Sequence, residues 1–384
     1  MSRIFIFFIW ILFDLSVQDH QAKGVELFQI DSNEIFFNSF TKWDAAHYLN
    51  IAKYGYLKDY YFVFFPIYPF LIKLISLLVQ FLLPINYSID KRLIVSGLII
   101  SNFFSIVNPL ILKQLLDNFK LNKKTTDLTI MLFIFNPATV FNFGIYTESL
   151  FCFFTFTSFY FYEKNKIFIS SIFFLLAGGV RSNGILNSVP LIFDLLYKTK
   201  SWAINFIPIL SSTVLYFFWN YFIYINLCNK HVDDQNQEDS VCKSSNINLY
   251  SYLQSKYWNV GFMTQYSFNQ IPNFILASPI IYYSSLFLYE FINDQIRSNL
   301  SMIKVKYSFH LLSLLLLGIF YAHIQITTRL IFSSSPVIYV FFAEKIIENS
   351  FISGRKYKNY LIYLYFGCYF IFGIFFHVNF FPWT

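Results

Sequence analysis

The sequence predicts an all-α polytopic membrane protein, and three observations carry this prediction. Of the 384 residues, 56% are hydrophobic and 23% aromatic, whereas only 13% are charged, against about 25% in soluble globular domains. The mean hydropathy is +0.51. Apolar runs suited to membrane helices recur along the whole chain, so residues 1–384 are predicted to form a single transmembrane domain.

The positive charge of the chain is distributed as in a membrane protein. The net charge is +7, but the Lys and Arg residues lie in short clusters between the apolar runs, as the positive-inside rule describes. The charge therefore indicates orientation in a membrane, with lipid as a partner, and argues against a nucleic-acid partner.

The first quarter of the chain alternates between apolar and polar segments. Ile4–Leu15 resembles the core of a signal peptide, but no clear small-x-small cleavage pattern follows it, so we predict a first membrane helix. Residues 18–61 then form a polar loop. The next apolar run, Phe62–Pro84, is interrupted by Pro66 and Pro69, which predicts a re-entrant or kinked element.

Two apolar runs in the middle of the chain are divided by polar residues. Leu93–Leu116 is long enough to span a bilayer. Leu128–Tyr162 is predicted to form two helices, because Asn136–Pro137 and the stretch after Ile145 interrupt it. Ile167–Tyr197 has about 30 residues, too few for two spans at about 1.5 Å per residue, so we predict two shorter helices that meet at a polar elbow.

The second half of the chain contains the largest polar loop, Asn226–Ile271, which is acidic. The clusters of Lys and Arg that follow it are predicted to be cytoplasmic, which places this loop on the opposite, luminal side. The lysines at 120–124 fit this orientation only if Phe62–Pro84 is re-entrant, and the sequence leaves that choice open. The predicted spans of this half are Trp202–Ile225, Phe274–Ile292, Tyr307–Tyr321, Leu330–Phe342 and Tyr360–Val378.

The polar stretch around Trp43 and Asp44 invites a chemical interpretation. If the segment that they begin is helical, Asp44, His47 and Tyr48 lie at i, i+3 and i+4 and share one face. That face presents a carboxylate, an imidazole and a phenol together. An alternative is structural: Thr41 caps a helix, and Asp44 three residues later completes a start that resembles a capping box. The spacing leaves both open.

Two ionisable residues interrupt apolar runs near the middle of the chain. Glu148 begins a Phe-rich segment, where it either serves a site or complements a helix dipole. Arg181 and Asn183 lie in the Gly178–Gly184 elbow. Arg181 is a candidate for binding a phosphate at a helix N-terminus, and snorkelling to the membrane interface is the alternative.

A third polar cluster lies between two predicted spans. His323, Gln325 and Arg329 are spaced over seven residues and are candidates for neutralising an anionic head group. The alternative is that they are solvated residues of a loop beside the membrane.

The four cysteines give no metal-binding pattern. Cys152 and Cys368 lie in apolar runs and are predicted to be buried thiols. Cys228 and Cys242 flank the acidic loop, and a disulfide between them suits an oxidising compartment. No Cys-x-x-Cys or His-rich spacing is present, so no metal cofactor is expected.

The polar stretches, taken in order, resemble the GPI mannosyltransferase II (PIG-V) family. The resemblance covers most of the chain and is weakest before Phe40, around residues 117–127 and across residues 198–248. The luminal loop and the loop before the last span are short for the family. The matching pieces are WDAAHYLNIAKYGY (Trp43–Tyr56), FFPIYPF (Phe64–Phe70), FNPATVFNFGIYTESLF (Phe135–Phe151), GVRSNG (Gly179–Gly184), YSYLQSKYWNVGF (Tyr250–Phe262), QIPNFILASP (Gln270–Pro279), HIQITTRLIFSSSPVIY (His323–Tyr339) and the terminal NFFPWT.

This resemblance implies a GT-C glycosyltransferase fold in the endoplasmic reticulum membrane, with luminal loops carrying the active site. The family is taken to add the second, α1,6-linked mannose to the mannosyl-GPI precursor from dolichyl-phosphate-mannose. An accessory subunit in the same membrane is a further partner to consider. The family's Trp-Asp pair falls on Trp43 and Asp44, and its Asp is the expected general base.

The chemistry of that reaction is consistent with the residues present. A dolichyl phosphate is a good leaving group, and inversion at the sugar needs one base to take the acceptor's proton. Arg329 and Arg181 are the candidate cations for the departing phosphate, assisted by His47 or His323. Two rival functions are another dolichol-phosphate-sugar transferase, acting on the N-glycan precursor or a protein, and a non-enzymatic lipid-linked sugar transporter.

Overall fold

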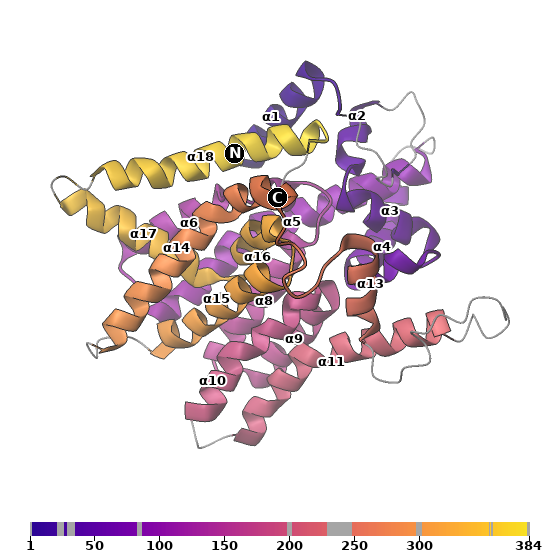
Figure 1. Ribbon diagram of the computed structural model, residues 1–384. Coiled ribbons are helices and arrows are strands. Elements are labelled where there is room, and N and C mark those ends of the chain that lie inside the picture. Colours follow the sequence, from indigo (N-terminus) through magenta and orange to yellow (C-terminus); the bar gives the residue numbers. More distant parts are fainter. Residues whose placement is uncertain are drawn as a thin grey trace.

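The all-α prediction is confirmed, because every regular element in the described part of the chain is a helix. Helices α1 (Ser2–Ser16) and α18 (Lys356–Val378), from the two ends of the sequence, pack side by side (Figure 1). The computed structural model describes residues 2–20, 27–28, 35–82, 87–197, 202–228, 248–296, 302–352, 354 and 356–381.

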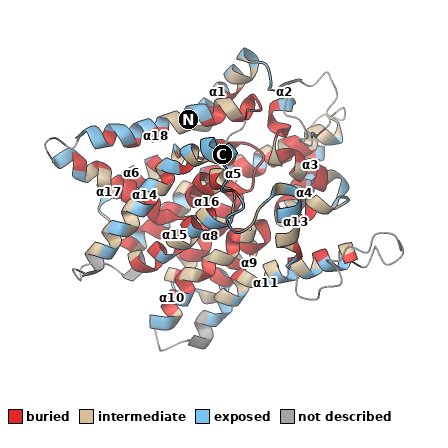
Figure 2. Cartoon of the chain, in the orientation of Figure 1, coloured by how far each residue is buried: buried red, intermediate tan, exposed pale blue. Residues whose placement is uncertain are grey.

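Within those ranges, four helices are long and apolar enough to cross a membrane. Each coincides with one of the predicted spans. Their outward faces expose large apolar side chains, whereas buried residues concentrate in the interior (Figure 2), as expected for helices surrounded by lipid. The four are α5 (Ile89–Leu116), α11 (Trp202–Cys228), α14 (Ile271–Ile296) and α18.

The predicted span Leu330–Phe342 is not one continuous helix, and the bent pair in its place is either a broken span or a re-entrant loop. Two helices, α16 (Thr327–Ser334) and α17 (Pro336–Phe351), meet there at an angle of 87°. Pro336 has no N–H to continue the preceding helix, and the residue before a proline avoids helical dihedral angles. Ser335 accordingly adopts φ −104° and ψ 113°. The bend places Arg329 on a short helix of its own.

Both runs in the middle of the chain are divided as predicted, but Leu128–Tyr162 contributes to three helices and not two, because the short α7 lies between its two breaks. The polar elbow packs tightly onto the helix before it: a Cβ on Gly184 would lie 2.8 Å from the Cα of Gly178. A side chain there would force the two segments apart. The helices of the two runs are α6 (Lys123–Ile134), α7 (Thr139–Phe143) and α8 (Glu148–Glu163), then α9 (Ile167–Val180), the 3₁₀ helix η4 (Ser182–Ser188) and α10 (Val189–Tyr197).

Helix α8 forms the centre of the interior, packed between α5 and α9. Its C-terminal residue Glu163 joins a buried ion cluster with α10 and with α15 (Met302–Phe320). Lys306 Nζ lies 2.6 Å from Glu163 Oε1 and 2.7 Å from Asp194 Oδ2. A buried ammonium group is costly unless it is paired, so this cluster joins the three helices.

The proline-broken run gives the 3₁₀ helix η2 (Asp59–Val63) and then α4 (Ile67–Leu82). The 16 residues of α4 span about 24 Å at about 1.5 Å each, less than the hydrocarbon core of about 30 Å. This length favours the re-entrant form over a full crossing.

The sequon at Asn86, which lies outside the described residues, tests that topology. If α4 re-enters, Asn86 is luminal, and we expect it to carry a glycan. Endoglycosidase treatment should then shift the mobility of the wild-type protein but not of Asn86→Gln. Labelling of Asn86→Cys by an impermeant thiol reagent in sealed microsomes would place this residue on the cytoplasmic side and contradict re-entry.

The cysteines fall into two groups. Cys152 and Cys368 are free thiols, whereas Cys228, at the end of α11, takes part in a disulfide bond. Cys242 lies outside the described residues, so its pairing with Cys228 stays a prediction.

Candidate active site

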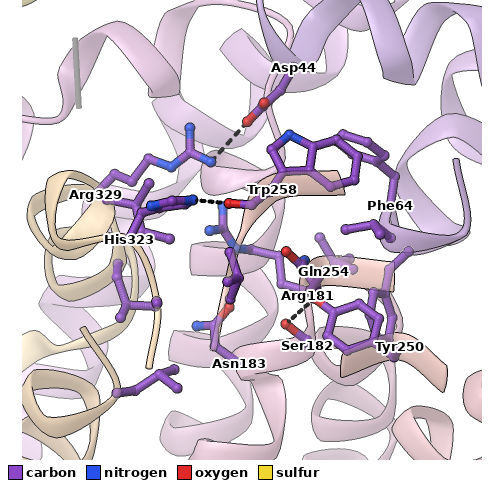
Figure 3. Close-up of a pocket in the computed structure, with 18 of the residues that line it drawn as sticks. Asp44, Phe64, Arg181, Ser182, Asn183, Tyr250, Gln254, Trp258, His323 and Arg329 are labelled. Atoms are coloured by element: carbon purple, nitrogen blue, oxygen red, sulfur yellow. Dashed lines mark hydrogen bonds and ion pairs between the residues drawn. The ribbon is translucent and has the colours of Figure 1, made fainter. Parts of the chain in front are cut away.

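A cavity of about 570 Å³ opens between α3 (Asp44–Tyr54), η4, α13 (Leu249–Trp258) and α16. Its lining combines charged, polar and aromatic side chains, with Asp44 and Arg329 paired on one side of the view (Figure 3). The sequence singled out nine residues for the site, and seven of them line this cavity. These seven are Trp43, Asp44, Arg181, Asn183, His323, Gln325 and Arg329.

The helix that carries Asp44 starts without a side-chain cap, so the capping interpretation is wrong. Helix α3 begins at Asp44 itself, and Trp43 precedes it with φ 59° and ψ −136°. Thr41 lies too far upstream and donates its hydroxyl to the Asn38 carbonyl at 2.8 Å. A non-glycine residue at positive φ costs about 1–3 kcal/mol and persists only where its surroundings fix it, which is typical of functional sites.

Lys42 anchors the turn at Trp43 that precedes α3. Its side chain is buried and donates to Asp19 Oδ1 at 2.5 Å and to the Val378 carbonyl at 2.6 Å. The turn is thereby tied to the segment after α1 and to the end of α18. Sequence reasoning missed Lys42, because its partners lie 23 and 336 positions away.

Four charged side chains alternate in sign at the polar end of the cavity. Arg329 Nη2 donates to Asp44 Oδ2 at 2.9 Å, and Arg329 Nε lies 3.3 Å from Glu148 Oε1. Glu148 also pairs with Arg181. The Glu148 side chain is only 1% exposed, a position tolerated because two guanidinium groups surround it. Glu148 therefore lies behind the cavity wall and positions both arginines.

Of the two carboxylates, Asp44 is the one that a ligand in the cavity can contact, since 31% of its side chain is exposed. Burial by itself would raise the pKa of Asp44, but the Arg329 guanidinium, with smaller contributions from His47 and Arg181, holds that pKa below its ordinary value. Asp44 is therefore ionised at neutral pH and able to accept a proton from a bound hydroxyl group.

Arg181 is held inside the protein, so the snorkelling alternative is wrong. It donates to Asn183 Oδ1 at 3.1 Å and to Thr147 Oγ1 at 3.0 Å, besides pairing with Glu148. Asn183 in turn donates to Ser334 Oγ at 3.4 Å. The elbow thus connects to α16, and Arg181 and Arg329 share one carboxylate within the same cavity wall.

His47 does not enter the cavity. Its ring stacks on Phe64 at 4.7 Å between centroids and contacts the edges of Tyr60 and Trp258. The expected face of α3 is therefore split: Asp44 and Tyr48 line the cavity, whereas His47 packs behind its aromatic wall.

His323 lines the cavity but is committed to the backbone of α13. Its Nε2 lies 2.6 Å from the Trp258 carbonyl, which makes Nε2 the protonated nitrogen and the donor. This hydrogen bond joins the segment before α16 to the end of α13, so His323 fixes the wall of the cavity. Gln325 lines the cavity beside it.

Helix α13 supplies cavity residues that sequence reasoning missed. Tyr250 donates its hydroxyl to Ser182 Oγ at 2.8 Å and accepts from Gln254 Nε2 at 3.0 Å. Tyr250, Gln254 and Trp258 recur at intervals of four residues and therefore share one helix face. That spacing was a usable signal for a polar-aromatic surface.

Comparison with known proteins agrees with these motifs. The whole chain, residues 1–384, matches the family described as mannosyltransferase (PIG-V). GPI alpha-1,6-mannosyltransferase 2 of Cricetulus griseus is 27% identical over 479 aligned residues, and the human protein of that name is 24% identical over 480. Both alignments cover 100% of this chain and 96% of the relative. GPI mannosyltransferase 2 of Drosophila pseudoobscura pseudoobscura is 25% identical, with 100% and 98% covered. The chain therefore belongs to the PIG-V mannosyltransferase family, as its motifs predicted, and is a glycosyltransferase.

Proposed function

We propose that this protein transfers mannose from dolichyl-phosphate-mannose to the 6-hydroxyl of a one-mannose GPI precursor. The product carries a second, α1,6-linked mannose. The observation that supports this most directly is the Asp44–Arg329 pair at the polar end of the cavity. It sets a base beside a cation, which are the two groups that a phosphate-leaving sugar transfer requires.

The proposed reaction is a single displacement with inversion. Asp44 takes the proton of the acceptor hydroxyl while that oxygen attacks the anomeric carbon of the donor mannose. The bond between that carbon and the phosphate oxygen breaks, and the phosphate leaves with the electron pair. One carboxylate suffices here, whereas glycosidases use a pair. Arg329 and Arg181 stabilise the departing phosphate, so we expect no divalent metal to be required.

The shape of the cavity fits substrates with a charged head and an apolar body. The arginines mark one end, while Phe64, Tyr250 and Trp258 line the rest. We place this cavity on the luminal side of the endoplasmic reticulum membrane, in a GT-C type fold, because the positive-inside rule predicts that the acidic loop before α13 and the basic clusters are on opposite sides.

The lipid that accumulates without the protein tests this function. In cells that lack it, we expect a one-mannose GPI intermediate to accumulate, and re-expression to remove it. Truncated N-glycan donors instead would assign the chain to another dolichol-phosphate-sugar pathway. Normal transfer in detergent extracts of those cells would indicate a transporter, because detergent makes a transporter unnecessary.

A further inference from the structure

The Tyr257–Gly261 stretch, part of one of the pieces that resemble the family, has no role in the chemistry above. The structure gives it a position. Helix α13 ends at Trp258, and Asn259 turns the chain with φ 53°. The indole lines the cavity and is partly exposed there. The indole is therefore placed where it can contact a bound sugar.

The backbone of this stretch is held firmly in place. The Trp258 carbonyl accepts from His323, as described above. Further along, the Met263 amide donates to the Phe320 carbonyl at 2.7 Å, and Gln265 Nε2 donates to the Ile319 carbonyl at 3.0 Å. These bonds fix the segment to the junction of α15 and α16, so the indole is set in position before any substrate binds.

Four aromatic rings contact the Trp258 indole, and of these Phe64 also lines the cavity. His47, Phe64 and Tyr60 contact the indole at interplanar angles of 73°, 78° and 74°. Tyr257 makes a similar edge contact at 66°. Among the described residues no ring stacks parallel to this indole. The indole is partly exposed and lines the cavity, so part of its surface is accessible to a ligand.

The indole and Arg329 line the same cavity as Asp44. In the view of Figure 3, Arg329 reaches the Asp44 carboxylate from one side, and Trp258 lies below Asp44 on the side of Phe64. We expect the anionic phosphate of a donor to bind beside the Arg329 guanidinium. The side with the indole is then left for the molecule whose hydroxyl Asp44 deprotonates.

We propose that Trp258 is the platform on which the acceptor's mannose ring stacks, held there by His323 and set so that the sugar's hydroxyl meets Asp44. The inference rests on the proposed function for the name of the acceptor. Its physical basis is that the face of an aromatic ring is negative, and the C–H groups on one face of a pyranose carry partial positive charge. The contact therefore orients the sugar as well as binding it.

The test compares Michaelis constants for the two substrates in purified variants. Trp258→Leu keeps apolar bulk without an aromatic face, and we expect it to raise the KM for acceptor on the order of tenfold with the donor KM unchanged. Trp258→Phe keeps a ring and is expected to stay within about threefold of wild type. His323→Ala should raise the same KM, since it releases the Trp258 carbonyl.

Phe268→Ala is the matched control, because Phe268 lies in the same segment, is 90% exposed and does not line the cavity. Its constants should match the wild type. Equal constants for Trp258→Leu and Trp258→Phe would overturn the platform, and so would an effect confined to the donor KM. The assay uses whichever sugar acceptor the wild-type enzyme accepts, so a failure of the GPI assignment shows in the wild type and is separate from the Trp258 result.

Discussion

Asp44→Asn is expected to abolish mannose transfer while leaving the protein folded, inserted and abundant. An amide does not take a hydroxyl proton at neutral pH, and removing a general base lowers the rate roughly 100- to 10,000-fold. The substitution is expected to change the stability of the fold little. Helix α3 has no side-chain cap to lose, the amide oxygen still accepts from Arg329, and Glu148 still faces that guanidinium.

The measurement is complementation of a null strain, together with quantified expression and transfer from dolichyl-phosphate-mannose in vitro. Asp59→Asn makes the same chemical change at a carboxylate of η2 that does not line the cavity, and it should retain activity. Near-normal transfer by Asp44→Asn at normal abundance would falsify the role of Asp44 as base. If the protein is lost together with activity, Asp44→Glu, which keeps the carboxylate, decides between chemistry and folding.

Arg329→Ala is expected to lower transfer about 100- to 1,000-fold, the range seen when a stabilising donor is removed from a reacting charge. The loss should fall on use of the donor more than on use of the acceptor, since we propose that the guanidinium pairs with the donor phosphate. Arg329→Lys should restore only part of the activity, because an ammonium group lacks the planar fork that contacts Asp44 and Glu148.

The pH profile of Arg329→Ala separates this role from a structural one. Asp44 must be ionised to act, so transfer is lost as the pH falls through its pKa. Arg329 holds that pKa below its ordinary value, so the wild-type acid limb lies under the usual range near 3.9. Without the guanidinium, burial raises the pKa, and the limb should move to higher pH.

Arg92→Ala, on α5 and outside the cavity, is the control for removing an arginine. Full complementation by both Arg329→Ala and Arg329→Lys would leave Arg329 a structural residue. An unchanged acid limb in Arg329→Ala would contradict the coupling between Arg329 and the base.

Local features of the fold were predictable because their causes are local. Asn136–Pro137 and the Gly178–Gly184 elbow break their helices through residues that the sequence shows directly. The bend at Ser335 was predictable in principle from Pro336, but the surrounding apolar run concealed it. The start of α3 was not, because the positive φ of Trp43 lies next to Lys42, whose side-chain contacts are distant in sequence.

The candidate site divides in the same way. Residue types and motifs identified Asp44, Arg181, Glu148 and Arg329 one at a time. Their pairing depends on contacts between residues 33 positions apart for Arg181 with Glu148 and 285 apart for Arg329 with Asp44, which one sequence does not reveal. The position of His47 was not predictable for a related reason. It lies on the helix turn that contains Asp44 and Tyr48, but it packs against aromatic rings from η2 and α13, outside the cavity.

The hydrogen bond from Lys42 to the Val378 carbonyl also has a consequence for the biogenesis of this enzyme. The turn that carries Asp44 emerges early from the ribosome, yet one of the two contacts of Lys42 is with the end of α18, 336 positions later. A nascent chain whose last helix has not been inserted holds this turn by the contact with Asp19 alone. We therefore expect activity to appear only after α18 has been inserted. A chain arrested before α18 should be inserted in the membrane but inactive.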